Sequence, residues 1–227
     1  MSNPEGPFPQ VSAAQARRAM LEEQIIARRV RDGAVLRALG HVPREAFVPE
    51  QIRSEAYTDR PLPIGNGQTI SQPYIVARMA EALALKLDDR VLEIGTGSGY
   101  GAAVLGSIAE NVVSIERDVE LASAASERLA RLGFDNITVE RADGSLGWAD
   151  RAPYDAICVT ATAPGVPPAL LEQLADEGRL VLPIGHPRHG QELIRIRRSD
   201  RGAPIRESLG RVHFVPLRGT AGWPEGL

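Results

Sequence analysis

The chain has 227 residues, of which 43% are hydrophobic and 24% are charged, a composition typical of a globular protein and not of a disordered one. Its formal net charge is −3, so no basic excess exists to neutralise a nucleic-acid backbone, and we expect no nucleic-acid partner. The single cysteine, Cys158, excludes an internal disulfide and any cysteine-based structural zinc site.

The amino-terminal residues and the apolar runs bear on where the protein acts. Residues 1–10 contain three prolines and no apolar core, which is not the pattern of a secretory signal. No apolar run approaches the roughly 18 residues needed to span a bilayer. We therefore expect a flexible tail over residues 1–10, no membrane partner and a cytoplasmic location.

The next part of the chain predicts helices followed by a proline-rich stretch. Strong and fair helix formers fill residues 13–30, and Asp32 can cap a short second helix that Gly40 ends. Five prolines then punctuate residues 43–73, so long regular elements do not fit there. We assign residues 11–72 to an amino-terminal elaboration of helices and loops.

After Pro73 the pattern alternates between helices and strands, which indicates βαβ units and a mostly parallel sheet with helices on both faces. Residues 192–197 and 211–217 alternate apolar and polar side chains and predict antiparallel strands at one edge. We place the core of this α/β fold over residues 73–218 and a carboxyl-terminal tail over residues 219–227. The expected helices are 74–87, 100–109, 119–132 and 168–175, and the expected parallel strands are 91–94, 112–115, 137–140, 156–160 and 179–184.

A glycine-rich turn follows the first strand of this core. Gly95, Gly97 and Gly99 alternate directly between a predicted buried strand and a predicted helix. Glycines allow the backbone to approach a ligand, and the helix N-terminus then offers free N–H groups. A tight turn without a ligand is the plain alternative.

The spacing of these glycines bears on the choice of ligand. A dinucleotide fingerprint counted from Gly95 fails because its third position is Tyr100, and counted from Gly97 it fits weakly through Ala102. No lysine follows as in a P-loop. The G-x-G-x-G form, with Glu93 two residues before the first glycine, is instead the pattern of S-adenosylmethionine-dependent methyltransferases.

Two acidic residues after the following strands fit a bound nucleoside. Glu116 lies 21 residues beyond Gly95 at a strand end, where an acid can accept hydrogen bonds from ribose hydroxyls. Asp143, followed by Gly144, comes at the carboxyl edge of the third strand and can accept a hydrogen bond from an adenine amino group. A solvated strand-end carboxylate and an Asp-Gly turn are the alternatives. Both acids support adenosine binding without choosing the cofactor.

At this point the sequence resembles the protein-L-isoaspartate O-methyltransferase family, from about residue 42 to residue 217. The Gly-Gln-Thr-Ile-Ser segment that ends at Ser71 is much more specific than the glycine turn, which many unrelated methyltransferases share. The resemblance implies a Rossmann-like, S-adenosylmethionine-dependent methyltransferase fold. The matching segments are Gly65–Ser71 with Pro73, Val91–Tyr100, Asp143–Gly144, Ala152–Ile157, Arg179–Gly185 and Phe214–Leu217.

The resemblance also implies an activity. Members of the family transfer a methyl group from S-adenosyl-L-methionine to the free α-carboxylate of L-isoaspartyl residues, and more weakly of D-aspartyl residues, with S-adenosyl-L-homocysteine as the product. The ester recloses to a succinimide, and repeated cycles return part of the damaged chain to normal aspartate. The implied partners are isoaspartyl-containing proteins and peptides, and we expect the enzyme to be a monomer.

The resemblance further assigns roles to residues. Ser71 matches the active-site serine, which contacts the substrate, and Val215 matches a position whose backbone helps to hold the isoaspartyl peptide. Asn66, Gly101 and Arg218 differ from the residues usual at their positions, which bears on substrate preference. The residues matched to the cofactor are Gln68, Thr69, Ile70, Gly95, Thr96, Gly97, Ser98, Gly99, Glu116, Asp143 and Gly144.

Methyl transfer to a carboxylate makes modest demands on side chains. A carboxyl group with a pKa near 4 is already ionised at neutral pH, so neither a general base nor a nucleophilic residue nor a metal is required, and we expect no metal site. The protein accelerates the reaction by excluding water and holding the two groups in line. We expect Ser71 to orient the carboxylate by donating its hydroxyl hydrogen bond. The alternative is that Ser71 caps the helix that begins near Pro73.

Three other functions remain open from the sequence. The same fold could methylate aspartate in a ribosomally made peptide to form an aspartimide, although only residues 218–227 follow the last predicted strand and such enzymes usually have a longer extension. A nicotinamide-dependent oxidoreductase is supported only by the shifted glycine register. A non-catalytic protein that binds S-adenosylmethionine would be expected to have a damaged Ser71 segment.

Overall fold

The computed structural model describes residues 12–199, 202–224 and 226. The predicted flexible tail over residues 1–10 lies outside this part of the chain. None of the described helices is long and apolar enough to cross a lipid bilayer. The division into an amino-terminal elaboration, a core and a tail stays a prediction.

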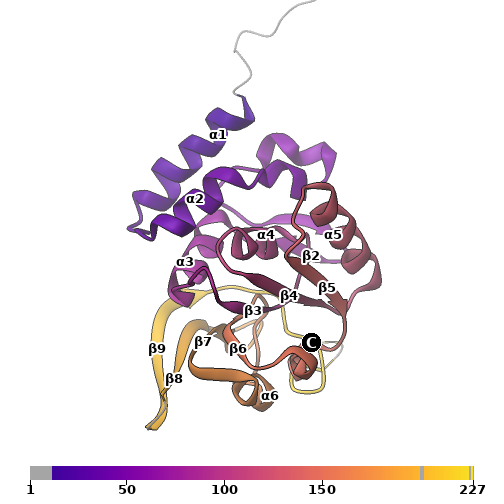
Figure 1. Ribbon diagram of the computed structural model, residues 1–227. Coiled ribbons are helices and arrows are strands. Elements are labelled where there is room, and N and C mark those ends of the chain that lie inside the picture. The colour runs from indigo at the N-terminus through magenta and orange to yellow at the C-terminus, as the bar shows by residue number, and fades with distance from the viewer. Residues whose placement is uncertain (1–11, 200–201, 225, 227) are drawn as a thin grey trace, which may run out of the picture.

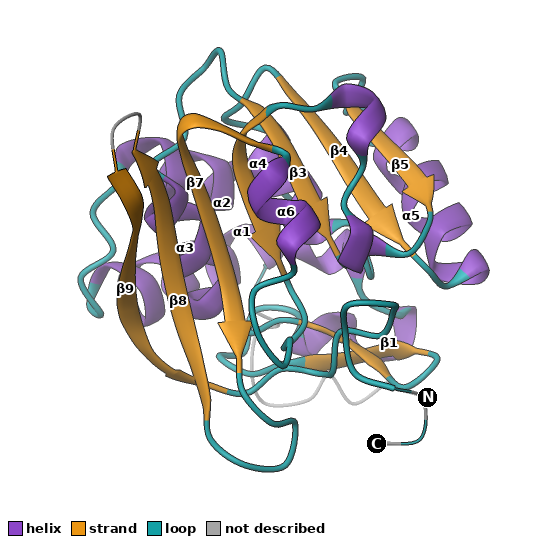
Figure 2. Ribbon diagram, turned by 90° about the horizontal axis from the view of Figure 1, so that it is seen from below, coloured by secondary structure: helices purple, strands orange, loops and turns teal. Residues whose placement is uncertain are grey.

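Seven strands form one sheet, shown in Figure 2. In spatial order they are β5 (Ile137–Arg141), β4 (Asn111–Glu116), β3 (Arg90–Ile94), β6 (Tyr154–Val159), β7 (Leu174–Ile184), β8 (Gln191–Ser199) and β9 (Gly202–Val212). The first five strands pair in parallel, whereas β7–β8 and β8–β9 pair antiparallel. This confirms the predicted parallel core with an antiparallel carboxyl-terminal edge. The order reverses at β3, the place where ligands bind in open α/β sheets.

Helices cover the two faces of the sheet unequally. In Figure 1, α3, α4 and α5 lie above the sheet, α1 and α2 lie above them, and α6 lies below. The second layer packs through α2 and a π-helical turn, η1, onto α3 and α4. The helical bounds are α1 Ala13–Ala19, η1 Met20–Ile26, α2 Gly33–His41, α3 Pro73–Leu83, α4 Tyr100–Gly106, α5 Val119–Arg131 and α6 Pro168–Glu172.

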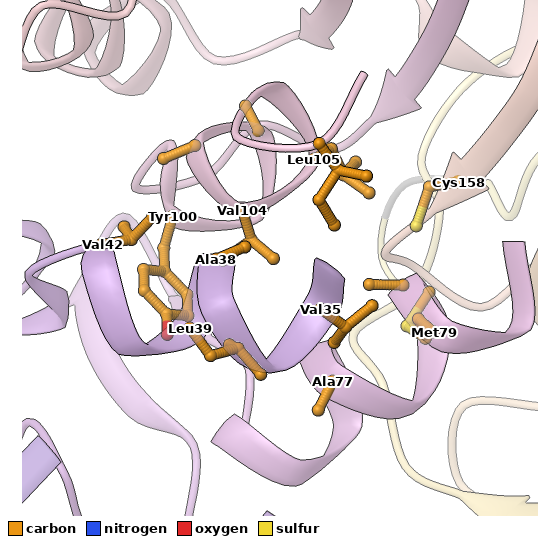
Figure 3. Close-up of a cluster of buried hydrophobic side chains, with 14 of the residues drawn as sticks. Val35, Ala38, Leu39, Val42, Ala77, Met79, Tyr100, Val104, Leu105 and Cys158 are labelled. Carbon is orange, nitrogen blue, oxygen red and sulfur yellow. The ribbon is translucent and has the colours of Figure 1, made fainter. Parts of the chain in front are cut away.

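Side-chain alternation along the central strands separates two buried clusters. Val91 of β3 faces the cluster formed with α2, α3 and α4, whereas Leu92 and Ile94 face the cluster on the side of α6. Glu93 therefore points to the same face as Val91, into the densely covered side. Figure 3 shows part of this larger cluster, in which Cys158 of β6 lies among apolar side chains.

The proline-rich stretch holds only short elements, as predicted. Two 3₁₀ turns, η2 (Arg44–Phe47) and η3 (Glu50–Glu55), precede a small antiparallel hairpin of β1 (Leu62–Gly65) and β2 (Gln68–Ile70). Two further 3₁₀ turns, η4 (Gly144–Leu146) and η5 (Ala149–Arg151), follow β5. The hairpin leads directly to Ser71 and α3.

One predicted strand and the ends of several predicted helices need correction. The strand expected over residues 211–217 is wrong, because β9 runs over Gly202–Val212 and the following residues leave the sheet. An edge strand that carries charged side chains such as Arg206 and Glu207 lacks the alternation that marks a half-buried strand. Several helices also end early: α3 ends at Leu83 because Ala84 adopts a left-handed conformation with φ 48°.

Candidate active site

The carboxyl ends of β3, β4 and β6 open into one pocket. The glycine turn after β3, the segment that contains Ser71 and the segment that contains Val215 all line it. Figure 1 shows the yellow carboxyl-terminal segment running from β9 along this edge toward β4 and β5. Segments that come before and after the parallel strands in the sequence thus both line the sheet edge predicted to bind a ligand.

The glycine turn requires glycine for two separate reasons. Gly95 has φ 95°, and a Cβ there would lie 2.4 Å from Thr160 Oγ1. The Thr160 hydroxyl sits this close because it donates to the carbonyl oxygens of Ile94 and Gly95, at 3.0 and 2.7 Å. Gly97 has φ 52° and lines the pocket, so its missing side chain leaves backbone facing a ligand.

Glu116 is held at the pocket by two backbone N–H groups. Its Oε2 accepts the Gly97 N–H at 2.9 Å, and its Oε1 accepts the Asp118 N–H at 3.0 Å. Each oxygen keeps a second lone pair, and the carboxylate lines the pocket. A ribose contact by Glu116 stays a prediction.

A substitution of Glu116 tests this placement. Glu116→Gln puts an amide group against a backbone N–H, so a hydrogen bond to a charged acceptor is lost. We expect the dissociation constant for S-adenosylhomocysteine, measured by calorimetry, to rise about 10- to 100-fold. Glu110→Gln, which removes an exposed carboxylate just before β4, should leave it unchanged. Equal affinities in both variants would contradict the role of Glu116.

Glu93 is a buried acid that lines the pocket. It is 1% exposed, and its Oε2 accepts the Ser114 hydroxyl at 2.6 Å. Ser114 in turn lies 2.6 Å from the Thr96 hydroxyl. Burial raises the pKa of Glu93 to about 8, the charge of Glu116 adds to this rise, and the Ser114 hydrogen bond opposes it. A Cβ on Gly101 would lie 2.3 Å from Glu93 Oε1, which explains the small residue at a position where the resemblance leads one to expect a larger one.

The raised pKa of Glu93 predicts a pH dependence of folding stability. The unfolded carboxyl ionises near pH 4.3, whereas the folded group keeps its proton up to about pH 8, so the unfolded state binds fewer protons in between. Glu93 therefore makes the free energy of unfolding fall with rising pH across this window, by at most about 1.4 kcal/mol per pH unit. We expect Glu93→Gln to flatten that slope in denaturant titrations between pH 5 and pH 8, and Glu110→Gln to retain it. Parallel slopes for Glu93→Gln and the parent chain would show that burial does not raise this pKa.

Asp143 holds the carboxyl-terminal segment in place. Its Oδ1 accepts the Ser145 N–H and hydroxyl at 3.0 and 2.7 Å, and its Oδ2 accepts the Thr220 N–H at 2.7 Å. Burial raises the pKa of Asp143, but the hydrogen bonds from Ser145 and Thr220 outweigh it and lower the pKa overall. Gly144 lines the pocket, whereas the Asp143 carboxylate is used to fix the segment around Thr220. An adenine contact by Asp143 stays a prediction.

Ser71 lines the pocket. The residue is half-buried, and its hydroxyl forms no hydrogen bond to any residue in the described ranges. The alternative in which Ser71 caps the following helix is wrong, because Gln72 is the N-cap of α3 and no side chain caps it. Pro73 at the first helical position has no N–H, so α3 has one unpaired donor fewer at its N-terminus.

Most of the residues predicted for the site meet in this pocket. Two predicted members lie outside its lining: Asp143, and Gly99, which is the N-cap of α4 with φ 88° and packs toward Leu129 of α5. Thr160 also lines the pocket, although the sequence does not predict it as a site residue. The one signal that could have indicated it is its position directly after a parallel strand. The predicted residues that line the pocket are Gln68, Thr69, Ile70, Ser71, Gly95, Thr96, Gly97, Ser98, Glu116, Gly144 and Val215.

The fold and this pocket define a methyltransferase that uses S-adenosylmethionine. The sequence model of the protein-L-isoaspartate(D-aspartate) O-methyltransferase (PCMT) family matches residues 15–222. The chain belongs to this family, as the resemblance in the sequence predicted.

Known relatives are similar to this protein in sequence over nearly the whole chain. Protein-L-isoaspartate O-methyltransferase 2 of Marinobacter nauticus is 57% identical over 208 residues, which cover 92% of this chain and 95% of that protein. The protein-L-isoaspartate O-methyltransferase of Protochlamydia amoebophila is 53% identical over 90% of this chain and 97% of its own. A Plasmodium falciparum structure, described as a protein-L-isoaspartate O-methyltransferase in complex with S-adenosyl-L-homocysteine, has a TM-score of 0.75 and 26% identity over 89% of this chain and 98% of its own.

Proposed function

We propose that this pocket carries out the repair methylation of L-isoaspartyl residues, and more weakly of D-aspartyl residues, in damaged proteins, with Ser71 as the residue that orients the substrate carboxylate. The observation that carries the proposal is that the free Ser71 hydroxyl and the glycine turn line the same pocket. Family membership favours this function over the nicotinamide-dependent oxidoreductase.

The residues of the chain divide the work of binding and orientation. S-adenosylmethionine, when bound, supplies a methyl group on a positively charged sulfur. Glu116 is placed to accept hydrogen bonds from ribose hydroxyls, and Gly95 and Gly97 allow the backbone to approach the ligand. Ile70 and Leu217 are buried and line the pocket, so they help to exclude water from it.

The substrate side of the pocket offers two donors. The Ser71 hydroxyl can donate to one carboxylate oxygen and leave the other free to attack. The carbonyl of Val215 accepts the Thr162 N–H at 2.8 Å, whereas the Val215 N–H has no partner among the described residues. Val215 lines the same pocket as Ser71, which supports the predicted role of Val215 in holding the peptide backbone.

A pair of peptides tests the proposed function. One contains L-isoaspartate and its twin contains normal aspartate at the same position, and each is incubated with methyl-labelled S-adenosylmethionine. We expect label in the isoaspartyl peptide alone. Label in both twins, or in neither while S-adenosylhomocysteine still binds, would reject the proposal. The aspartimide-forming alternative predicts label in a normal aspartyl peptide. The monomeric state and the cytoplasmic location stay predictions.

A further inference from the structure

Arg44 is a buried arginine that the proposed chemistry does not use. It begins η2, in the amino-terminal elaboration, and its exposed fraction is 0%. Fully buried arginines are rare unless they pair with an acid. Within the described part of the chain, the guanidinium of Arg44 forms no ion pair, so some other requirement keeps this charge inside the protein.

The guanidinium instead bridges backbone carbonyls. Nε donates to the carbonyl oxygen of Ala56 at 2.7 Å, and Nη2 donates to the carbonyl oxygen of Ser71 at 2.8 Å. Nη1 is buried and has no hydrogen-bond partner among the described residues. A planar guanidinium can hold two acceptors in a fixed relation, which a flexible ammonium cannot do.

The same guanidinium lies over the ring of Tyr100, in the helix that follows the glycine turn. Its central carbon lies 4.8 Å from the centre of the Tyr100 ring, and Tyr100 is the first residue of α4. Figure 3 shows Tyr100 in the buried cluster that also contains Leu39 and Val42. Arg44 thus connects the segment that ends at Ser71 with the element that carries the cofactor turn.

The chain on either side of Ser71 is held by the pairing of Ile70 with Leu62 and by Gln72, whose side chain donates to the Asp59 carbonyl oxygen at 3.1 Å. On the peptide group between Ser71 and Gln72 itself, the hydrogen bond from Arg44 is the only one to a described residue. The Ser71 hydroxyl forms no hydrogen bond to a described residue, Pro73 has no N–H, and no side chain caps α3. The hydrogen bond from Arg44 therefore fixes the peptide group that joins Ser71 to Gln72. A shift of that peptide group would move the Ser71 hydroxyl relative to the glycine turn.

We infer that Arg44 is the positioning residue of the active-site serine: its guanidinium holds the Ser71 carbonyl against α4, so that the hydroxyl meets the substrate carboxylate in line with the methyl donor. The inference rests on the proposed function and adds a residue that touches neither ligand, since Arg44 does not line the pocket. Such a residue affects the substrate reaction more than cofactor binding.

The test is Arg44→Lys with Arg179→Lys as its matched control. Arg179 is also largely buried, donates to the carbonyl oxygens of Leu83 and Ala84 at 2.7 and 3.1 Å, pairs with Asp89, and lies outside the pocket lining. Both changes keep the positive charge and remove the planar fork. If Arg44→Lys does not fold, Arg44→Met fills the space without a buried charge and is measured in the same way.

Three readouts are compared in the two variants. For Arg44→Lys we expect kcat/KM for the isoaspartyl peptide to fall about tenfold, the dissociation constant for S-adenosylhomocysteine to stay within about twofold, and the amides of residues 68–72 to exchange with solvent about tenfold faster. Arg179→Lys should change none of the three, even where its melting temperature falls by a similar amount.

Two results would overturn the inference. Kinetics and amide exchange that match those of Arg179→Lys would reduce Arg44 to a structural residue and overturn the inference. An equal loss of peptide kinetics and cofactor affinity would do the same, because it would indicate general damage to the pocket. If the parent chain methylates no isoaspartyl peptide, the proposed function fails, and amide exchange over residues 68–72 still decides whether Arg44 restrains Ser71.

Discussion

Ser71→Ala is expected to lower turnover of the isoaspartyl peptide about 100-fold, with the dissociation constant for S-adenosylhomocysteine unchanged within about twofold. Ser71 lines the pocket, and its hydroxyl has no hydrogen-bond partner among the described residues, so its loss removes a donor to the substrate without breaking a hydrogen bond to any of them. Misplacement of a reacting group by about 1 Å can cost on the order of 100-fold in rate. Single-turnover methylation and calorimetry measure the two quantities separately.

Two further variants sharpen this prediction. Ser71→Thr keeps a hydroxyl and should recover part of the lost turnover, whereas Ser123→Ala, on the exposed face of α5, should leave turnover unchanged. Turnover in Ser71→Ala equal to that of the parent chain would remove Ser71 from the mechanism. A matched loss of cofactor affinity would instead assign Ser71 to cofactor binding.

Gly95→Ala is expected to weaken S-adenosylhomocysteine binding at least about 100-fold. The added Cβ would lie 2.4 Å from Thr160 Oγ1, and the backbone there has φ 95°, a conformation that side chains rarely adopt. The turn must shift to relieve the contact, and the same turn carries the backbone that faces the ligand. The expected loss corresponds to about 2.7 kcal/mol of binding free energy.

Gly133→Ala is the matched control for this change. Gly133 also has a positive φ, 80°, but no atom lies within 4 Å of an added Cβ and the residue is outside the pocket lining. It should lower the stability by roughly 1 kcal/mol and leave cofactor affinity unchanged. Similar affinities in Gly95→Ala and Gly133→Ala would show that the glycine turn does not shape the ligand site.

The parallel core could be predicted because its signals are local. The strand before Gly95, the alternating glycines and the acid at the end of the next strand all lie within 26 residues, from Val91 to Glu116. Asp32 and Asp118 cap the helices that follow them, and each accepts two backbone N–H groups. The cap at Asp32 could be predicted from its residue type and its position before a helix. The Ser71 segment was predicted through its likeness to a family, because a lone serine before proline is as typical of a helix cap.

Other contacts of the site join residues that lie far apart in the sequence, so no local pattern predicts them. Thr220 meets Asp143 across 77 positions, and Arg44 meets Ser71 across 27, so no periodicity marks either pair. The raised pKa of Glu93 follows from its burial under α4, which the strand pattern alone does not reveal. β9 was misplaced because edge strands carry charged residues on faces that a central strand would bury.

A crystal structure of the chain with S-adenosylhomocysteine and an isoaspartyl peptide would test the central claim most directly. We predict that the homocysteine product lies against Gly95–Ser98, that the free α-carboxylate of the isoaspartyl residue faces its sulfur, and that the Ser71 hydroxyl lies about 2.7 Å from one carboxylate oxygen. A peptide bound with that carboxylate turned away from the sulfur, or a Ser71 hydroxyl beyond hydrogen-bond distance, would contradict the account.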